Sequence, residues 1–369
     1  GSLGLPINPD YNGEAQEGVG YYQRMIQSGK RHSAATGFLH PALSRSNLHL
    51  RTHAHVTRLD TENNNVIGVS YQIEGENYYA RARRETLLCA GAISSPHLLQ
   101  VSGIGPGELL QNLEIPLVHD SPGIGEGLQD HYAVRVSHQI NKAISLNHRS
   151  RGVRLLWETI RWYLNGGGLL AFSPAHVGAF LCTNPELPFP DLQFVFTPAS
   201  YAESTDPIGK LHPYPGITCG VWQMVPTSRG FVRAASSDPF RSPAIQPNYL
   251  ATELDQLAVV RGLKWCRKLL NTNTLKPYLM DEILPGLQCR QDDDLLTYAA
   301  KSGTTVYHPV GSCRMGTDNM AVVDPQLRLK GMTGLRVVDA SVMPTIVSAN
   351  TNAATLMIAE KAAQLILDQ

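Results

Sequence analysis

One histidine lies in a setting that suits proton transfer. His308 belongs to the stretch TTVYHPVGSCRMG, residues 304–316, between a β-branched approach and a glycine-flanked turn. The residues leading to Tyr307 should be extended, and Pro309 disfavours the helical region for His308, so its side chain should be held by a stiff backbone. An imidazole that titrates near neutral pH can act as a general base. A core histidine with satisfied polar atoms is the alternative explanation.

A second polar group precedes the last helix that the sequence predicts. Asn350, Thr351 and Asn352 stand just before ATLMIAEKAAQLIL, a nearly all-apolar run that should form a buried helix. Asn352 is a good N-cap for this helix. The N–H groups and the positive dipole end of such a helix favour a phosphate or an organic anion. Asparagines that only cap the helix and turn the chain would explain the same residues.

Three glycine clusters resemble a dinucleotide-binding loop at first sight. They lie at residues 18–23, 103–107 and 123–127. None of them satisfies G-x-G-x-x-G, and none joins a strand directly to a helix in the order which that fingerprint requires. Glycines in tight turns explain them better.

Histidines and serines elsewhere in the chain do not form a persuasive site. His49, His53 and His55 alternate along one expected strand face, but no carboxylate or cysteine stands at ligand spacing, so we expect no metal site. Ser312 does not belong to a nucleophile elbow, because G-x-S-x-G would need a glycine at Val310. Turn formation explains Ser312 more simply.

A hairpin and a helix should form in the first third of the chain. Apolar residues alternate with histidine and arginine over residues 48–56, which predicts a strand with one solvent-facing side. TENNN should be the turn that follows and VIGVSYQI the return strand. Farther on, Ser94 or Ser95 can cap a helix that has Pro96 at its first position and ends at Gly103.

The middle of the chain should combine a surface helix with an antiparallel sheet. Residues 148–168 keep their apolar side chains on one helical face, and the helix should stop at three consecutive glycines. Residues 171–250 contain many prolines and short β-type runs, which favours a mixed or antiparallel sheet over a βαβ series. A second amphipathic helix should follow in TELDQLAVVRGLKWCRKLL.

Composition excludes several classes of protein. Lys plus Arg and Asp plus Glu both number 31, which gives no net charge and a pI near 7.3, so a nucleic-acid partner is not expected. The six cysteines form no CxxC pair, which indicates a reducing compartment and neither a disulfide framework nor a zinc site. No apolar run approaches the roughly 18 residues that span a bilayer. We therefore expect a cytoplasmic protein that acts on small neutral substrates.

Four blocks, in the same order, resemble the glucose-methanol-choline oxidoreductases, flavoproteins that oxidise alcohols. They are GAISSPHLLQVSGIG at 91–105, GIGEGLQDH at 123–131, VYHPVGSCRMG at 306–316 and GLRVVDASVMPTIVSANTNAATLMIAEKAAQLI at 334–366. The segments DYNGEAQEGVGYYQ and HSAATGFLHPALSRSNL are similar to those of the alcohol and choline dehydrogenase branch. The resemblance covers essentially the whole chain.

The resemblance implies roles for particular residues. His308 corresponds to the active-site histidine of the family and Asn350 to its partner, so both would be catalytic. The residues that would contact FAD are Val56 at the adenine, Asp339 and Ala340 near the diphosphate and flavin, and Asn352 beside the pyrimidine side of the isoalloxazine ring. No carboxylate can be assigned to bind a quaternary ammonium, so a choline-specific substrate is not indicated.

The resemblance also implies a reaction. An alcohol would be oxidised to an aldehyde by hydride transfer to flavin N5 of FAD, with His308 as the base, and the electrons would pass to an acceptor such as a quinone. An oxidase that uses O2 and a non-catalytic fragment are the alternatives. The protein would be cytoplasmic, with a peripheral position at the inner membrane left open, and would have no transmembrane segment.

The fold class that follows is α+β or α/β. We expect a partial, Rossmann-like FAD-binding domain over residues 41–131 and 306–369. A substrate-binding domain, a mostly antiparallel sheet flanked by helices, should comprise residues 1–40 and 132–305. Family members begin with a strand and a dinucleotide glycine fingerprint, so we expect this chain to be a C-terminal portion that lacks that segment.

Overall fold

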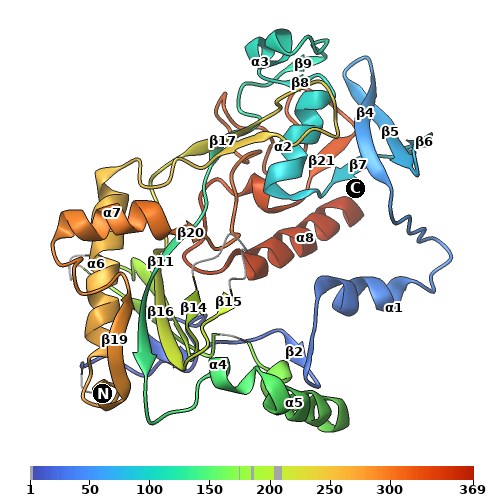
Figure 1. The fold of residues 1–369 in the computed structure, drawn as a ribbon. Coiled ribbons are helices and arrows are strands. Elements are labelled where there is room, and N and C mark those ends of the chain that lie inside the picture. Colours follow the sequence, from blue (N-terminus) through green and yellow to red (C-terminus); the bar gives the residue numbers. More distant parts are fainter. Residues whose placement is uncertain (1–2, 174, 184–186, 203–209) are drawn as a thin grey trace. The chain divides into compact units, whose positions relative to one another are not determined.

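The computed structural model describes residues 3–173, 175–183, 187–202 and 210–369. The chain forms two compact units. Unit 1 comprises Gly1–Leu50, Tyr132–Met224 and Gln256–Thr304, and unit 2 comprises Arg51–His131, Val225–Asp255 and Thr305–Gln369. Helices and strands mix in both units, as the labels in Figure 1 show, which confirms the expected combination of α and β structure.

Unit 1 is built on a seven-stranded sheet. Its strands follow the spatial order β1 (Gly18–Tyr21), β12 (Val177–Leu181), β13 (Leu192–Thr197), β16 (Gly216–Gln223), β11 (Tyr132–Ile140) and β19 (Leu279–Leu284), with β20 (Thr304–Thr305) paired to β11. Neighbours from β1 to β19 run antiparallel. The antiparallel sheet expected from the prolines and short β-type runs is thereby confirmed.

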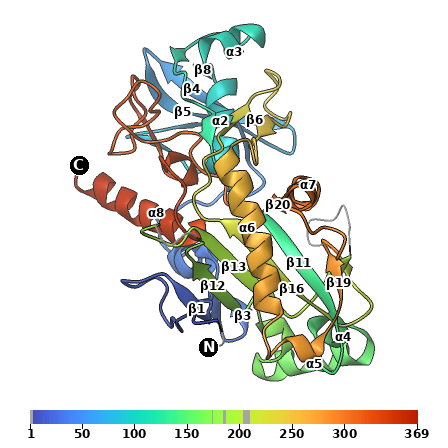
Figure 2. The same cartoon turned by 90° about the vertical axis from the view of Figure 1, so that its left-hand side faces the viewer.

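Helix α6 (Glu253–Leu270) lies across this sheet, as Figure 2 shows. The contact is close, because a β-carbon added at Gly262 would lie 2.9 Å from Val221 Cγ2 on β16. The other described elements of unit 1 are β2 (Ile26–Gln27), β3 (Lys30–Arg31), the π-helix Ala35–Leu39, α1 (His40–Ala42), α4 (Leu146–Arg149), α5 (Gly152–Asn165), the 3₁₀ turn Leu169–Ala171, β14 (Tyr201–Ala202), β15 (Lys210–Leu211), the 3₁₀ turn Lys276–Tyr278 and α7 (Asp292–Ser302).

Unit 2 carries several small sheets. Two are antiparallel, namely β4 (His55–Glu62), β5 (Asn65–Ile73) and β6 (Glu76–Arg81), and β10 (Glu126–Leu128), β17 (Gly230–Arg233) and β18 (Ala244–Gln246). Two parallel pairs are β7 (Thr86–Leu88) with β21 (Leu335–Val337) and β8 (Ile104–Gly105) with β9 (His119–Asp120). The helices are α2 (Gly91–Val101), α3 (Gly107–Asn112), the 3₁₀ turn Ala340–Val342 and α8 (Thr351–Leu367).

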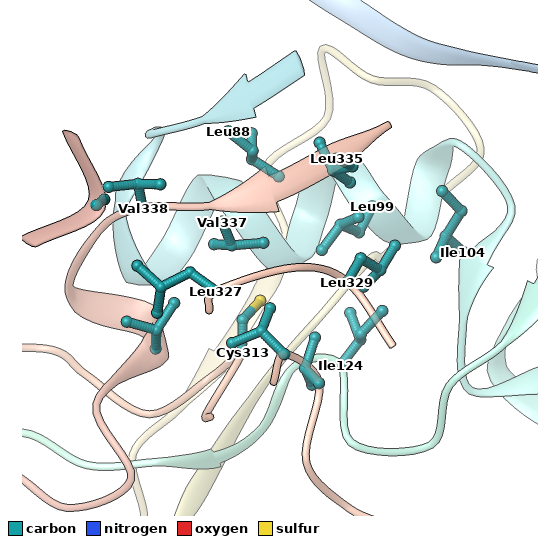
Figure 3. Close-up of a cluster of buried hydrophobic side chains, with 14 of the residues drawn as sticks. Leu88, Leu99, Ile104, Ile124, Cys313, Leu327, Leu329, Leu335, Val337 and Val338 are labelled. Atoms are coloured by element: carbon teal, nitrogen blue, oxygen red, sulfur yellow. The ribbon is translucent and has the colours of Figure 1, made fainter. Parts of the chain in front are cut away.

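The core of unit 2 is a cluster of buried apolar side chains between α2, the β7–β21 pair and the loops near residues 313 and 327 (Figure 3). Leu99 of α2 and Val337 of β21 are both fully buried in it. The labelled members are Leu88, Leu99, Ile104, Ile124, Cys313, Leu327, Leu329, Leu335, Val337 and Val338. This core brings the C-terminal residues, from 305 onward, together with residues 51–131.

The hairpin expected from TENNN is confirmed, but its first strand starts later than predicted. Asn63 and Asn64 turn the chain with φ of +48° and +58°, the conformation of a tight hairpin turn. Strand β4 begins at His55, so the strand expected over residues 48–56 is wrong for residues 48–54. His53 adopts a φ of +55°, which interrupts an extended run.

Helix α2 also differs from its predicted start. The sequence predicts a helix that begins at Pro96 behind a serine cap, whereas the helix begins at Gly91 and contains Pro96 in its interior. Proline has no N–H for the carbonyl of Ala92, four residues earlier. The Ser312 hydroxyl donates a hydrogen bond to that carbonyl at 2.5 Å instead. A tertiary contact thus replaces the missing helical hydrogen bond. The expected end of the helix at Gly103, which has a φ of +83°, is correct.

Residues 225–255 belong to unit 2, whereas the expected boundaries place them in the substrate-binding domain. Strand pairing is the reason, since β17 joins β10 and β18 joins β17. Gln100 of α2 adds a hydrogen bond to the Val232 carbonyl at 3.0 Å. The first boundary differs as well, because residues 41–50 fall in unit 1.

Candidate active site

Asp130 fixes the backbone around His308. Its Oδ1 accepts a hydrogen bond from the His308 N–H at 2.8 Å. Its Oδ2 accepts from the Tyr249 hydroxyl at 2.5 Å and from the Thr305 hydroxyl. Tyr307 adopts a φ of +62°, which bulky residues rarely do, so the extended approach predicted up to Tyr307 is wrong at that residue. The strained turn and the carboxylate together set the position of His308.

The ring of His308 contacts a polar side chain at each nitrogen. Its Nδ1 lies 2.9 Å from Nδ1 of His131, and the two rings are nearly perpendicular, at 86°. Its Nε2 lies 3.2 Å from Nδ2 of Asn350. The Asn350 amide nitrogen can only donate, so with the amide in this orientation Nε2 of His308 accepts and a neutral ring carries its proton on Nδ1, toward His131. The structure therefore brings His308 and Asn350 together, 42 residues apart in the chain.

The surroundings of His308 favour its neutral form. Burial lowers the pKa of His308, and the nearby negative charge of Asp130 opposes that effect in part. His131, on the other side of the ring, is fully buried. A neutral imidazole with a lone pair on Nε2 can accept a proton from a hydroxyl group.

Gln129 connects the segments that carry these residues. Its backbone exchanges two hydrogen bonds with Val310, at 2.9 and 3.0 Å. Its side-chain amide donates to the Pro226 carbonyl at 2.7 Å and accepts from the Ile346 N–H at 3.0 Å. The site is therefore supported by a buried glutamine that bonds to three separate stretches of unit 2.

Asn350 and Asn352 lie at the beginning of α8. The N-cap is Asn350, with φ of −63° and ψ of +135°, and its side chain makes no capping hydrogen bond. The prediction that Asn352 caps the helix is therefore wrong, since Asn352 is the second helical residue. The Asn350 amide is directed to His308 instead, and the positive end of the α8 dipole lies beside this pair.

Helix α8 is less buried than its apolar sequence predicts. Its buried residues are Thr351, Ile358 and Ala362, which share one stripe. Ile358 and Ala362 belong to the unit 2 core. Met357 on the other side is 60% exposed, so the expectation of a fully buried helix is wrong.

Asp339 has its carboxylate engaged within the protein. Its Oδ2 accepts from the Gly91 N–H at 2.9 Å and from the Ser95 hydroxyl at 2.6 Å. Its Oδ1 accepts from the N–H and the hydroxyl of Ser341. The side chain thus fixes the start of α2 against the 3₁₀ turn that begins at Ala340, and any contact of Asp339 with a ligand would use its backbone.

Val56 is separate from these groups in the described contacts. It is the second residue of β4, half-buried, and pairs with Tyr71 of β5. The hydrogen bonds of the site join His308, Asn350, His131 and Asp130, and none of those that the structure describes involves Val56.

Three residues that contact or support His308 are not predicted from the sequence. Gln129, Asp130 and His131 lie in GIGEGLQDH, a block that resembles the family but whose members have no predicted role. The adjacent acid and histidine were a usable signal, because such pairs suit proton chemistry. Their contact with His308 spans 177 residues and is visible only in the fold.

Among residues 3–173, 175–183, 187–202 and 210–369, no group of three or more His, Cys, Asp or Glu side chains could hold a metal ion. Across the same residues, every helix is too short or too polar to span a bilayer.

Family models identify the class of this protein. Two models described as GMC oxidoreductase match residues 1–133 and 226–359, which together make up more than half of the chain. The chain belongs to the GMC oxidoreductase family, as its four sequence blocks indicate.

Curated relatives place it near choline dehydrogenases. An oxygen-dependent choline dehydrogenase from Cronobacter sakazakii is 40% identical over 366 residues, which cover 98% of this chain and 65% of the relative. One from Pseudomonas fluorescens is 40% identical over 371 residues, which cover 98% of this chain and 64% of the relative. The chain thus spans just under two thirds of the length of these relatives.

Solved structures share the fold. Pyridoxine 4-oxidase from Mesorbium loti matches with a TM-score of 0.87 and 29% identity, over all of this chain and 68% of that one. A formate oxidase matches with a TM-score of 0.90 and 23% identity, over 99% of this chain and 68% of that one. The second likeness, at this identity, concerns the fold alone.

FAD is the cofactor of this family, and the donor set of the site fits its redox-active ring. An amide donor and a neutral imidazole stand beside the positive end of a 17-residue helix. That helix end favours negative charge in the space before it, and the imidazole can hold a proton there.

Proposed function

We propose that the protein oxidises an alcohol to an aldehyde with FAD as its cofactor. One observation carries this proposal: Nε2 of a neutral His308 lies beside the amide of Asn350, while Nδ1 is bonded to His131. This arrangement suits removal of a hydroxyl proton. The names of the relatives, which include choline dehydrogenase and pyridoxine 4-oxidase, support oxidation chemistry.

Each residue of the site has a distinct part in the reaction. FAD, when bound, supplies the hydride acceptor at N5 of its flavin. His308 takes the substrate hydroxyl proton at Nε2, and the carbon–hydrogen bond becomes hydridic as that proton leaves. Asn350 cannot titrate and holds the substrate oxygen by a hydrogen bond from Nδ2. His131 keeps the lone pair of His308 on Nε2, and Asp130 stabilises the positive imidazolium that results.

Four further residues are proposed to contact FAD. Asn352 lies in the first turn of α8, where the dipole favours the negative charge of a flavin. Asp339 and Ala340 would contribute backbone groups, because the Asp339 carboxylate is already bonded. The backbone of Val56 would meet the adenine.

The proposal assigns cofactor binding and substrate binding to different units. Unit 2 binds FAD and supplies the base, since His308, Asn350, His131 and Asp130 all belong to it. Unit 1 makes up most of the proposed substrate-binding domain. A primary alcohol is the proposed substrate, a quinone the proposed acceptor and the cytoplasm the proposed compartment, with a peripheral position at the inner membrane as the alternative location.

Oxidation by O2 is the second candidate for the same site. The curated relatives are named oxygen-dependent, and the pyridoxine and formate enzymes are named oxidases. Hydrogen peroxide formed in proportion to the alcohol consumed in air would select this candidate over a quinone-dependent dehydrogenase.

Flavin reduction by alcohols tests the proposal. The purified chain is incubated with FAD, freed of unbound cofactor and mixed anaerobically with a series of primary alcohols that includes choline. We expect flavin absorbance to remain with the protein and to bleach with at least one alcohol. A chain that retains no flavin, or a bound flavin that no alcohol reduces, would contradict the proposal and support a non-catalytic fragment.

A further inference from the structure

Helix α5 presents its apolar side chains to solvent. We call these residues the α5 stripe; they are Val153, Leu156, Trp157, Ile160, Tyr163 and Leu164. Their spacing of three and four places them on one helical face. Trp157 is 67% exposed, Leu164 77% and Tyr163 84%. Soluble proteins rarely leave so many neighbouring apolar side chains exposed, and a contiguous apolar patch is typical of an interaction site.

The opposite face of α5 holds the helix to unit 1 by polar contacts (Figure 1, green). Glu158 is buried, pairs with Arg149 and accepts a hydrogen bond from the Leu169 N–H at 2.7 Å. The indole N–H of Trp162 donates to the Gly29 carbonyl at 2.8 Å. The helix ends at Gly166, with a φ of +64°, as the sequence predicts. The amphipathic helix is thus firmly attached, with its apolar side outward.

Arginines border the α5 stripe. Arg154 and Arg161 are exposed and, seven residues apart, lie along one edge of the stripe. Arg151 is exposed at the start of the helix and donates to the Leu211 carbonyl at 2.6 Å. Among the described residues, no ion pair joins these three arginines to an acid. Since the single acid of α5, Glu158, is already paired, the surface around the stripe is positive.

We propose that α5 lies in the interface of a membrane that contains anionic lipid. A helix with Trp and Leu on one side and arginine beside them has the composition of helices that lie in the headgroup plane. Positive residues at such a surface gain from anionic headgroups. A second copy of the chain fits less well, because a two-fold contact through this stripe would bring the same arginines together. The inference goes beyond the proposed chemistry, since lipid binding needs neither FAD nor turnover.

Vesicle co-sedimentation tests this inference. The purified chain is mixed with vesicles of phosphatidylcholine alone or with added phosphatidylglycerol, and the bound fraction is measured. We expect binding to the anionic vesicles that falls at least about tenfold in the Leu156→Ser/Trp157→Ser variant, because two exposed apolar side chains leave the lipid. Arg154→Ser and Arg161→Ser should each weaken it by about fivefold. Leu367→Ser, at an exposed leucine of α8, is the matched control and should bind like the wild type.

Three results would overturn the inference. The wild type could fail to bind anionic vesicles, or the double variant could bind as well as the wild type. Alternatively, sedimentation velocity could reveal a dimer of the wild type that the double variant abolishes, without lipid binding by either, which would make the α5 stripe a self-contact. Equal melting temperatures of variant and wild type establish that the fold is intact. Flavin reduction by alcohols, measured separately, distinguishes failure of the lipid-binding inference from failure of the proposed reaction.

Discussion

At the scale of single residues, the pair of imidazoles sets the chemistry of the site. Their Nδ1 atoms lie 2.9 Å apart, which leaves room for one proton between them, and we propose that His131 accepts this proton from His308. With His131 as acceptor, the lone pair of His308 faces Asn350, where the proposed reaction needs a base. His131 is a positioning residue in this scheme, because it acts through His308.

Replacement of His131 should show whether it orients the His308 ring by a hydrogen bond or only packs against it. We expect His131→Phe to slow flavin reduction by an alcohol by about tenfold or more, the usual effect of losing a group that orients a reactive imidazole. His131→Asn keeps an acceptor and should recover part of the rate. The ¹⁵N shifts of the His308 ring report the proton position directly. An unchanged tautomer in His131→Phe would remove His131 from this role.

The pH dependence of kcat/KM should report His308. Activity needs the neutral ring, and burial lowers its pKa below the ordinary 6.5, so the rate should rise with pH and the midpoint of that rise should lie below 6.5. Asp130 raises the pKa, and Asp130→Asn should therefore move the acid limb to lower pH. A limb that moves to higher pH in this variant would contradict the assignment.

Replacement of Asn350 should slow the reaction with the substrate and leave the retention of FAD unchanged. Its amide lies 3.2 Å from His308 and does not cap α8, so Asn350→Ala should leave the helix intact. We expect slower flavin reduction, by about tenfold, because one hydrogen bond to the reacting oxygen is lost. Release of flavin from this variant, seen in the filtrate after ultrafiltration, would make Asn350 a cofactor ligand instead.

At the scale of elements, α2 shows where local rules stop. Proline at the first helical position is the common case, so the sequence favours a start at Pro96. The actual start at Gly91 depends on two distant groups: Asp339 accepts from the Gly91 N–H, and Ser312 donates to Ala92. A helix that needs partners about 220 to 250 residues away cannot be delimited from its own sequence.

Loss of the Ser312 hydroxyl should therefore destabilise unit 2. Ser312→Ala leaves the buried Ala92 carbonyl without its donor, which should lower the free energy of unfolding by about 1–3 kcal/mol. Ser94→Ala, at an exposed serine of the same helix, is the control and should change it by less than about 0.5 kcal/mol. Thermal unfolding followed by circular dichroism distinguishes them, and equal stability of the two variants would refute this use of Ser312.

At the scale of the whole molecule, features that depend on adjacent residues were predictable from the sequence, and features that depend on contacts between distant segments were not. The hairpin turn at Asn63–Asn64 and the end of α5 at Gly166 were predictable, because each depends on a few adjacent residues. The family blocks pointed to His308 and Asn350. The role of His131 and the place of residues 225–255 in unit 2 depend on contacts between separate stretches, which periodicity does not encode.

The decisive measurement is the rate at which an alcohol reduces bound flavin in His308→Ala. Stopped-flow mixing without oxygen isolates this step, and His49→Ala, at an exposed histidine outside the site, is the matched control. If His308 takes the hydroxyl proton, its removal should slow reduction by about 10²–10⁴-fold while the control reduces at the wild-type rate. Reduction of His308→Ala at the wild-type rate would contradict the role of His308 as the base.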